Sequence, residues 1–368
     1  MRFTMYNSPR MNVPVRKHIT AMQGYTPGEQ PADVSVVKLN TNENPYPPSP
    51  LVLSAIGDIT AEQLRRYPSP DARDFRRDAA AVHHVEPEMI LPTNGGDELL
   101  ALVVRACAGE NARVAYLDPG YSLYPVLATM QAAVPVPVAY EISSQQWRVP
   151  QDIGNVDAAV LLIVNPNAPS GTLIDLSTLE DIARRFSGLL LIDEAYVDFA
   201  PISALSLVPR FPNLILLRSM SKGYGLAGMR FGYGIAQAPL IAELYKVRDS
   251  YPCDVVAIAA ATAAIRDQAY AKAVWQKVIQ QRQWMTDQLV ALGFGVPESH
   301  SNFVLAQVPA GMDAALLYQQ LKSRNILVRY FNLPRLTDKL RITIGTPQQN
   351  KILIQALAEL KKRHEASV

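Results

Sequence analysis

Stretches of apolar, often β-branched residues alternate with stretches of helical periodicity from about residue 90 onwards. Strands are expected at 113–118, 133–139, 158–164, 188–193 and 213–218, with helices at 97–108, 121–131 and 175–187 between most of them. The runs 158–164 and 189–192 are apolar almost throughout, which is typical of strands buried on both faces. Because strands that alternate with helices form parallel sheets with right-handed crossovers, the pattern predicts an α/β fold with helices flanking the sheet.

The C-terminal part of the chain predicts a smaller unit of α+β type. A long helix is expected at 267–292, with Val274, Val278, Met285 and Leu289 on one side. An expected strand at 303–308, a helix at 313–323, strands at 326–330 and 340–344 and a helix at 348–362 follow it. We therefore expect a large domain over residues 46–265 and a small domain over residues 266–368.

The N-terminal part of the chain is rich in proline. Residues 44–50 read Asn-Pro-Tyr-Pro-Pro-Ser-Pro, and proline lacks the N–H group that helices and sheets use. Residues 1–50 are therefore expected to be extended rather than to form a packed helix or sheet. Because an extended arm needs a surface to lie on, we expect residues 1–45 to join the small domain and a partner subunit.

Composition and charge exclude several classes of protein. Lys and Arg number 35 and Asp and Glu 33, and the net charge of +2 does not predict binding to nucleic acid or to an anionic membrane. The longest apolar run, 255–265, is shorter than the roughly 20 residues of a membrane span, and residues 1–6 lack the apolar core of a signal peptide. The two cysteines give no disulfide framework, and no metal is expected because His and Cys lack metal-ligand spacing. The sequence indicates a soluble, cytoplasmic protein.

Polar and ionisable residues follow three successive expected strands. Residues 165–171 (Asn-Pro-Asn-Ala-Pro-Ser-Gly) follow the first of them, residues 193–196 (Asp-Glu-Ala-Tyr) the second, and residues 219–230 the third. Ligands of open α/β sheets bind beyond the carboxyl ends of the strands. Each segment alone is compatible with an ordinary loop, but together they predict one site at this edge of the sheet.

Two ionisable residues in these segments suggest a particular chemistry. Asp193 ends an apolar strand, where a carboxylate either caps the next turn or pairs with a protonated ligand nitrogen. Lys222 is either a solvated loop lysine or an amine that forms a Schiff base with a carbonyl ligand. Ser219, Ser221 and Arg230 flank it and are residue types that bind phosphate. A Schiff-base lysine, a phosphate site and an aspartate that faces a ring nitrogen together predict pyridoxal phosphate.

Two further segments at the same edge could take part in this site. Gly96 and Asp97 precede an expected helix, whose first N–H groups can bind an anion, although an aspartate there is also a common helix cap. Tyr121 follows the strand at 113–118 and either offers an aromatic face to a ligand or belongs to the core.

In its motifs, the chain resembles the class I and II pyridoxal-phosphate aminotransferases, and most closely their histidinol-phosphate aminotransferase branch. The resemblance runs from about residue 25 to the C-terminal helix. It implies an aspartate-aminotransferase-like fold of the large-plus-small-domain type, pyridoxal 5'-phosphate as cofactor, and aminotransferase activity. The motifs that carry it are Asn-Glu-Asn-Pro at 42–45, Arg-Tyr-Pro at 66–68, Gly-Gly-Asp-Glu at 95–98, the segments 165–171 and 193–196, Ser-Met-Ser-Lys at 219–222 through Arg230, and Leu-Arg-Ile-Thr-Ile-Gly at 340–345.

The resemblance also implies roles for individual residues toward the cofactor. Lys222 would hold it as a Schiff base and later shuttle a proton. Asp193 would keep the ring nitrogen protonated, and Tyr196 would donate to the ring oxygen O3′. Tyr121 would stack on the ring. The phosphate would be held by the amides of Gly96 and Asp97, by Ser219, Ser221 and Arg230, and by Tyr67 of the other subunit of a homodimer.

For the substrate, the resemblance implies two arginines. Arg341 matches the arginine that binds the substrate carboxylate in many members of the family, and Arg329 matches a second arginine of the histidinol-phosphate branch. Two arginines suit a substrate phosphate but also fit a dicarboxylate acceptor. Tyr25 and Asn302 are expected to line the same pocket.

One position departs from the family pattern. The family usually has an asparagine directly before the Pro-Thr/Ser-Gly turn, where it bonds to O3′, and this chain has Ala168 there. Either Asn167, to which we assign the role, or Asn165 substitutes, or Tyr196 alone bonds to O3′. Loss of one such bond is worth roughly 1–2 kcal/mol, which would retune the cofactor without abolishing its chemistry.

The activity that the resemblance implies is reversible amino-group transfer between histidinol phosphate and 2-oxoglutarate, a step of L-histidine biosynthesis. It would proceed in two half-reactions through pyridoxamine phosphate, so the expected partners are a small-molecule amine donor and a 2-oxo acid acceptor. Three alternatives stay open: an aromatic amino acid as donor, decarboxylation of phosphothreonine on the same fold, and a cofactor-binding module that regulates. The presence of Lys222 argues against the last of these.

Overall fold

The computed structural model describes residues 14–33, 35–143 and 146–366. Within these residues, seven strands form one sheet in the order β2-β10-β9-β8-β7-β3-β4. Neighbours from β9 to β4 are parallel, and β10 is antiparallel to both β2 and β9. The strands are β2 (Ile90–Thr93), β3 (Arg113–Asp118), β4 (Val134–Ala139), β7 (Val160–Val164), β8 (Leu189–Asp193), β9 (Leu214–Ser219) and β10 (Gly232–Ala236).

The sheet confirms the α/β prediction and its central strands. All five predicted strands are present, and β7 and β8 are buried along their whole length, as their apolar runs predict. The strand β2 was not predicted, because it is short and contains Pro92. It lies at the edge of the sheet, which is where a strand tolerates a proline.

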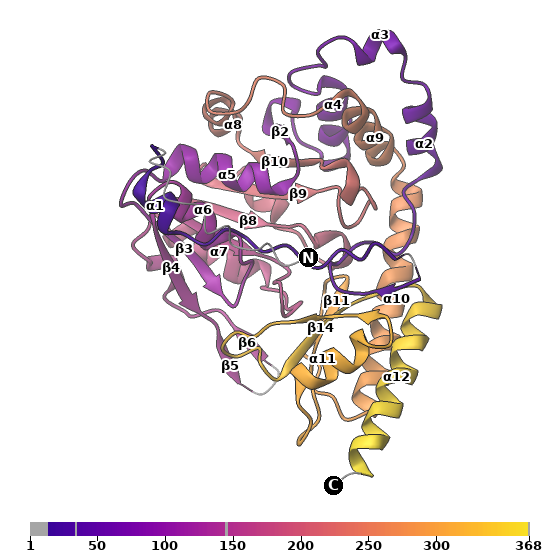
Figure 1. Cartoon of the computed structure of the whole chain (residues 1–368). Helices are drawn as coiled ribbons and strands as arrows, with labels where there is room; N and C mark the ends of the chain where they lie inside the picture. The colour runs from indigo at the N-terminus through magenta and orange to yellow at the C-terminus, as the bar shows by residue number, and fades with distance from the viewer. Residues whose placement is uncertain (1–13, 34, 144–145, 367–368) are drawn as a thin grey trace.

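Helices cover both faces of this sheet (Figure 1). Successive side chains of a strand point to opposite faces, so Leu161 and Ile163 pack into one apolar cluster while Val160 and Leu162 pack into another. On the first face lie α4 (Arg73–His83), α7 (Leu176–Arg185) and α9 (Val255–Arg266), and on the second α5 (Gly96–Cys107), α6 (Tyr124–Met130) and α8 (Ala238–Tyr245).

The prediction of a helix from residue 121 needs a correction at its start. The helix α6 begins at Tyr124, because Pro125 occupies its first turn and residues 121–123 form a turn in which Tyr124 N donates to Tyr121 O at 3.1 Å. Tyr121 is thereby kept at the end of β3 instead of inside a helix, a position that matters for the site.

The C-terminal part packs around its own apolar cluster. Among the described residues it has a three-stranded sheet of β11 (Phe303–Gln307), β14 (Lys339–Thr343) and β13 (Arg329–Tyr330), covered by α10 (Gln268–Ala291), α11 (Ala314–Lys322) and α12 (Pro347–Glu365). The predicted single strand at 326–330 is wrong in one respect. Its first half, β12 (Ile326–Leu327), pairs with another segment, because Val328 separates two pieces that bond to different neighbours.

The neighbour of β12 comes from the N-terminal arm, which corrects the prediction that residues 1–50 form neither helix nor sheet. The strand β1 (Val37–Lys38) pairs in parallel with β12. Residues 32–44 contain no proline, so their N–H groups are available, and Leu39 N donates to Leu327 O at 2.7 Å. A five-residue helix, α1 (Lys17–Ala21), also forms, whereas residues 1–13 of the predicted arm lie outside the described residues.

Short elements complete the fold. Helices α2 (Pro50–Gly57) and α3 (Ala61–Leu64) follow the arm, and a hairpin of β5 (Glu141–Ser143) and β6 (Gln146–Arg148) follows β4. The 3₁₀ turns are η1 (Pro87–Met89), η2 (Ile153–Asn155), η3 (Val197–Phe199), η4 (Ala204–Leu207) and η5 (Ala227–Met229).

The long helix α10 links the seven-stranded sheet to the three-stranded sheet, as Figure 1 shows. Near its start, Ala271 packs with the core of the seven-stranded sheet, while Val278, Met285 and Leu289 pack with the C-terminal cluster. These three residues are among those that the periodicity places on one side. The domain boundaries at 45/46 and 265/266 remain predictions.

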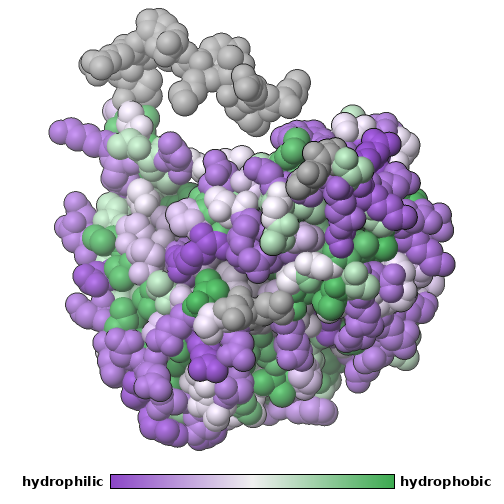
Figure 2. Space-filling model, turned by 90° about the horizontal axis from the view of Figure 1, so that it is seen from below, coloured by the Kyte–Doolittle hydropathy of each residue, from purple (hydrophilic) through white to green (hydrophobic). Residues whose placement is uncertain are grey.

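The surface and the helices bear on the question of membranes. Hydrophilic and hydrophobic side chains are interspersed over the face seen from below (Figure 2). In the part of the chain that the structure describes, no helix combines the length and the apolar character needed to cross a membrane.

Candidate active site

The strands β7, β8 and β9 are neighbours in the sheet and end at the same edge. In register, Val164 lies opposite Asp193, and Asp193 lies opposite Leu217. The polar segments that follow these three strands therefore begin side by side. This arrangement confirms the expectation that they meet at one edge of the sheet.

Asp193 is the last residue of β8 and its side chain is buried. Its Oδ1 accepts from the backbone N–H of Ala195 at 3.0 Å, and its Oδ2 accepts from the hydroxyl of Tyr124 at 3.1 Å. Burial nevertheless raises the pKa of Asp193 to about 6, since two donors do not replace the hydration of a carboxylate. Such a group strongly favours a cationic partner, for instance a protonated ring nitrogen.

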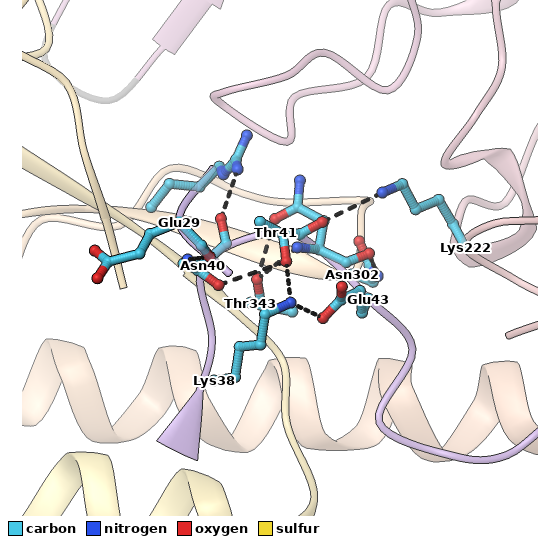
Figure 3. Close-up of polar contacts among 10 residues, drawn as sticks. Glu29, Lys38, Asn40, Thr41, Glu43, Lys222, Asn302 and Thr343 are labelled. Carbon is cyan, nitrogen blue, oxygen red and sulfur yellow. Dashed lines mark hydrogen bonds and ion pairs between the residues drawn. The ribbon is translucent and has the colours of Figure 1, made fainter. Parts of the chain in front are cut away.

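Lys222 lies three residues beyond the end of β9 and points toward the N-terminal segment (Figure 3). Its Nζ donates to the backbone O of Thr41 at 3.3 Å and lies 5.8 Å from the ring centre of Tyr196. Burial, reinforced by the positive charge of Arg341, lowers the pKa of Lys222 to about 8. A neutral amine, which nucleophilic attack on a carbonyl requires, is therefore accessible close to neutral pH.

Tyr196 is buried beside this lysine. Its hydroxyl accepts a hydrogen bond from Nδ2 of Asn42 at 3.0 Å, and its ring packs edge-on against Phe303 at 5.1 Å. Burial raises the pKa of Tyr196 above its ordinary value, so the phenol keeps its proton and can donate it to a ligand.

A potential anion site lies at the start of α5. Gly95 has φ +79° and precedes Gly96, the first residue of the helix, whose first turn leaves backbone N–H groups without partners inside the helix. Arg230 reaches this place, donating from Nη2 to Oδ2 of Asp97 at 3.4 Å. The guanidinium offsets the Asp97 carboxylate, so an anion would meet the amide of Asp97 and not an isolated negative charge.

The two serines of the predicted phosphate site lie close together. Ser221 donates its backbone N–H to Oγ of Ser219 at 3.2 Å, which turns the chain directly after β9. Tyr121 joins the same group from the end of β3, because its hydroxyl donates to Oδ1 of Asp97 at 3.2 Å.

The predicted substrate residues come from the three-stranded sheet and the arm. Arg329 and Arg341 face each other directly in the register of β13 and β14. Arg341 donates from Nη2 to Asn40 O at 3.0 Å and lies over the ring of Phe303, but its buried Nε has no hydrogen-bond partner among the described residues. A guanidinium with a buried, unpartnered N–H is prepared for an anionic ligand.

The remaining two predicted substrate residues occupy different layers of the site. Tyr25 of the arm packs edge-on against Tyr121 with ring centres 5.9 Å apart, so it contacts one of the predicted cofactor residues. Asn302 is fully buried, and its Nδ2 donates to the backbone O of Asn42 at 2.9 Å. Within the described residues its Oδ1 has no partner.

Tyr67 and Asn167 are placed differently from the other predicted residues. Tyr67 is 81% exposed and stacks on Tyr251 with ring centres 4.5 Å apart. A residue so exposed is available to another subunit, as the predicted role requires. Asn167 is buried, and its Nδ2 is already used by Oγ of Ser170 at 2.7 Å and Pro119 O at 3.4 Å.

Several residues of the site were not predicted. Asn42 and Thr343 belong to the family motifs at 42–45 and 340–345, whereas Thr41 and Tyr124 belong to none of these motifs. The sequence signal for Asn42 is its residue type. Asparagine is among the residue types most tolerant of the left-handed conformation, which Asn42 adopts at φ +57°. Tyr124 carries no such signal, since an aromatic residue in an amphipathic helix reads as core.

Comparison with known proteins identifies the family of this chain. The family model for aminotransferase class I and II matches residues 34–357. The chain belongs to this aminotransferase family. It is 47% identical to histidinol-phosphate aminotransferase 1 of Trichormus variabilis, over 94% of this chain and 98% of that protein. It is 44% identical to histidinol-phosphate aminotransferase of Citrifermentans bemidjiense, over 95% and 99%.

A solved structure supports the fold of this aminotransferase. The histidinol-phosphate aminotransferase of Sinorhizobium meliloti, in complex with pyridoxal-5'-phosphate, has a TM-score of 0.81 and 27% identity, over 88% of this chain and 90% of that one. The aspartate-aminotransferase-like fold and the enzyme class that the motifs imply are thereby confirmed, as is pyridoxal 5'-phosphate as cofactor.

The residues present in this aminotransferase fit that cofactor. The amine of Lys222 can lose its proton close to physiological pH, the Asp193 carboxylate is buried without a cation among the described residues, and the start of α5 offers free N–H groups beside Arg230. Each of these features matches one part of the group: the carbonyl, the ring nitrogen and the phosphate. Among the described residues, no three His, Cys, Asp or Glu side chains are grouped as metal ligands would be.

Proposed function

We propose that this aminotransferase transfers the amino group of histidinol phosphate to 2-oxoglutarate in histidine biosynthesis. The observation that carries the proposal is the pairing of Arg329 with Arg341 at one wall of the site, in a chain that matches histidinol-phosphate aminotransferases over nearly its whole length. Two guanidinium groups bind a phosphate dianion on the donor and the two carboxylates of the acceptor, so one pocket serves both half-reactions.

The cofactor supplies an electron-withdrawing ring that stabilises negative charge at the reacting carbon of the substrate. Lys222 would hold its carbonyl carbon covalently, and the free Nζ amine would be the base that moves a proton within the site. Asp193 would hold the proton on the ring nitrogen, because its buried carboxylate favours a cation. Tyr196 would donate a hydrogen bond to O3′.

The phosphate of the cofactor would be held at the start of α5. Gly96 and Asp97 offer backbone N–H groups, and Ser219, Ser221 and Arg230 add hydroxyls and a guanidinium. The hydroxyl of Tyr121 donates to Asp97 in this group, and its aromatic face would cover the ring. Tyr25 packs edge-on against Tyr121 and would border the site on this side.

We further infer a homodimer in which Tyr67 contacts the cofactor phosphate of the partner subunit. The exposure of Tyr67 supports this assignment, as do exposed apolar side chains in the same part of the chain. Leu53 on α2 is 69% exposed, and Leu64 on α3 is 60% exposed. Exposed apolar residues that gather in one region typically mark an interaction surface.

The function is tested by an absorption titration of the cofactor-loaded protein. Histidinol phosphate is added without a 2-oxo acid, and phenylalanine is added in a parallel cuvette. Under the proposal, histidinol phosphate at low concentration bleaches the band of the bound cofactor and 2-oxoglutarate restores it. Bleaching by phenylalanine alone would move the function to aromatic transamination. If neither donor bleaches the band, phosphothreonine with detection of carbon dioxide tests the decarboxylase alternative.

The covalent attachment is tested separately with two lysine variants. Lys222→Ala should lose the borohydride-reducible link to the cofactor, whereas Lys246→Ala, which removes a solvent-exposed lysine paired with Glu243, should keep it. Reducible labelling of Lys222→Ala at the wild-type yield would refute the assignment of the Schiff base.

A further inference from the structure

Asn42 is a buried residue with an uncommon backbone conformation next to the predicted catalytic tyrosine. It is 2% exposed and has φ +57°, in the left-handed region. Its Nδ2 donates to Oη of Tyr196 at 3.0 Å across 154 positions of sequence. Its backbone O accepts from Asn302, so both ends of the residue are held inside the site.

Thr343 of β14 determines which way the amide of Asn42 points. The Thr343 Oγ1 accepts the backbone N–H of Asn42 at 3.0 Å and donates its own proton to Oδ1 of Asn42 at 3.1 Å. With the amide reversed, that oxygen would face two N–H donors, and its proton would lose the acceptor it has in the described structure. Because a buried unpaired donor costs about 1–3 kcal/mol, the orientation with Oδ1 toward Thr343 is favoured.

The orientation of the amide fixes the direction of the tyrosine hydrogen bond. Since Nδ2 must donate, the hydroxyl oxygen of Tyr196 must accept, and its proton is free for a second partner. We propose that Asn42 is a positioning residue that, held by Thr343, directs the hydroxyl proton of Tyr196 to the ring oxygen of the cofactor. This inference rests on the proposed function.

The departure at Ala168 gives this role particular weight in the present chain. Alanine supplies no hydrogen bond, and the nearby Asn167 already donates through Nδ2 to Ser170 and Pro119. The only polar side-chain atom that Asn167 leaves free within the described residues is Oδ1, an acceptor, which does not suit a ring oxygen that itself accepts. Asn165 uses both its Nδ2 and its Oδ1 on the backbone of Ile174. The donor at that oxygen would therefore be Tyr196, and its direction would depend on Asn42.

The decisive variant is Asn42→Asp, because aspartate has the same shape but only accepts. The proton of Tyr196 would then turn to the introduced carboxylate and away from the cofactor. A donor favours the ionised form of the ring oxygen, so its loss should raise the pH midpoint of the absorption change of the bound cofactor by about one unit or more. The readout is this midpoint in the loaded protein, without substrate, together with the melting temperature of the cofactor-free protein.

Introducing Asn42→Asp into a Tyr196→Phe protein separates the effect of the added charge from the effect of the hydrogen bond. Tyr196→Phe should raise the midpoint by itself, and Asn42→Asp should then shift it by about one unit less than in the wild-type background. Equal shifts in the two backgrounds would overturn the inference, since a merely structural or electrostatic effect of Asn42 does not need the Tyr196 hydroxyl.

A second pair of variants covers the case in which Asn42→Asp does not fold. Thr343→Val removes the group that orients the amide and should raise the midpoint, whereas Thr343→Ser keeps the hydroxyl and should restore the wild-type value. Identical midpoints for the valine and serine variants would contradict the proposal. The wild-type protein separates the two hypotheses: without a Lys222-dependent band the proposed function itself fails, whereas a normal wild-type midpoint with unshifted variants refutes only the role of Asn42.

Discussion

At the scale of single residues, the site owes its reactivity to burial of groups that would be ordinary in water. Asp193 and Lys222 have opposite charges and opposite shifts, since burial raises the pKa of the carboxyl and lowers that of the amine. Both shifts arise because burial disfavours the charged form of each group. The cofactor would offset both costs. Its cationic ring nitrogen would pair with the Asp193 carboxylate, and its carbonyl would react with the neutral Lys222 amine.

Asp193→Asn should weaken catalysis and yet stabilise the cofactor-free protein. Removing one partner of a buried ion pair costs about 3–5 kcal/mol, which corresponds to a loss of roughly two to four orders of magnitude in kcat/KM for histidinol phosphate. Because the folded pKa is raised to about 6, the cost of the buried charge is fully present above that pH and disappears as the carboxyl is protonated in acid. The gain in melting temperature should thus be seen near pH 8 and vanish near pH 4. An equal gain at both pH values would contradict this account.

Capture of the cofactor by the cofactor-free protein should follow the titration of Lys222. The rate should rise with pH about a midpoint near 8 and not near the ordinary lysine value of 10.5, since only the neutral amine attacks. Stopped-flow absorption measures it. Because Arg341 contributes to the lowered pKa, Arg341→Met should move the midpoint upward. An unchanged midpoint in this variant would show that Arg341 does not lower the pKa of Lys222.

At the scale of elements, the start of α5 is shaped by close approach of three chain segments. The conformation of Gly95, at φ +79° and ψ 169°, belongs almost exclusively to glycine. A Cβ at Gly95 would lie 2.8 Å from Nη2 of Arg230, and one at Gly232 of β10 would lie 2.8 Å from the backbone of Gly95. The helix can therefore present its N–H groups to an anion only because these positions lack side chains.

Gly95→Ala should reduce the affinity for the cofactor while the fold is kept. Backbone strain of about 1–3 kcal/mol and displacement of Arg230 should raise the dissociation constant roughly tenfold or more, as measured by quenching of protein fluorescence. Gly109→Ala, just beyond the other end of the same helix, is the matched control. A Cβ there would meet nothing within 4 Å among the described residues. Equal affinities for the two variants would argue against an anion site at the start of α5.

At the scale of the whole molecule, the arm and α10 tie the two sheets into one unit around the site. Thr41 and Asn42 of the arm lie between Lys222 on one side and Thr343 on the other. An ion pair between Arg335 and Asp118 adds a further link, from the loop before β14 to the end of β3. We propose that residues 46–265 and 266–368 are the two domains, with the site at their junction.

Leu53→Glu should weaken the proposed homodimer. A charge on a leucine that is 69% exposed in one chain costs little in an isolated monomer but disfavours its burial between subunits. Light scattering at micromolar concentration should show a shift toward monomer, with lower activity because Tyr67 no longer reaches the partner. Leu316→Glu, on α11 and 58% exposed, is the control and should keep the mass of the wild type. A fully active monomeric wild-type protein would exclude the shared site.

Much of this architecture follows from local patterns in the sequence. Alternation of apolar strands and amphipathic helices predicts the parallel core, and the placement of Asp193 and Lys222 after buried strands predicts their common edge. Side-chain periodicity reports which face of an element is buried, and that information is present in a short window. The family motifs predicted the aminotransferase class and its cofactor, which the comparisons confirm.

Other features were decided only by the tertiary structure. The pairing of β1 with β12, the division of residues 326–330 between two sheets and the contact of Asn42 with Tyr196 join positions far apart in the chain. No local pattern encodes such pairs, because they arise where buried N–H, C=O and hydroxyl groups must find partners once the core has closed. The sequence by itself thus determined which residues could do chemistry, and the folded chain decided which proton each of them can give.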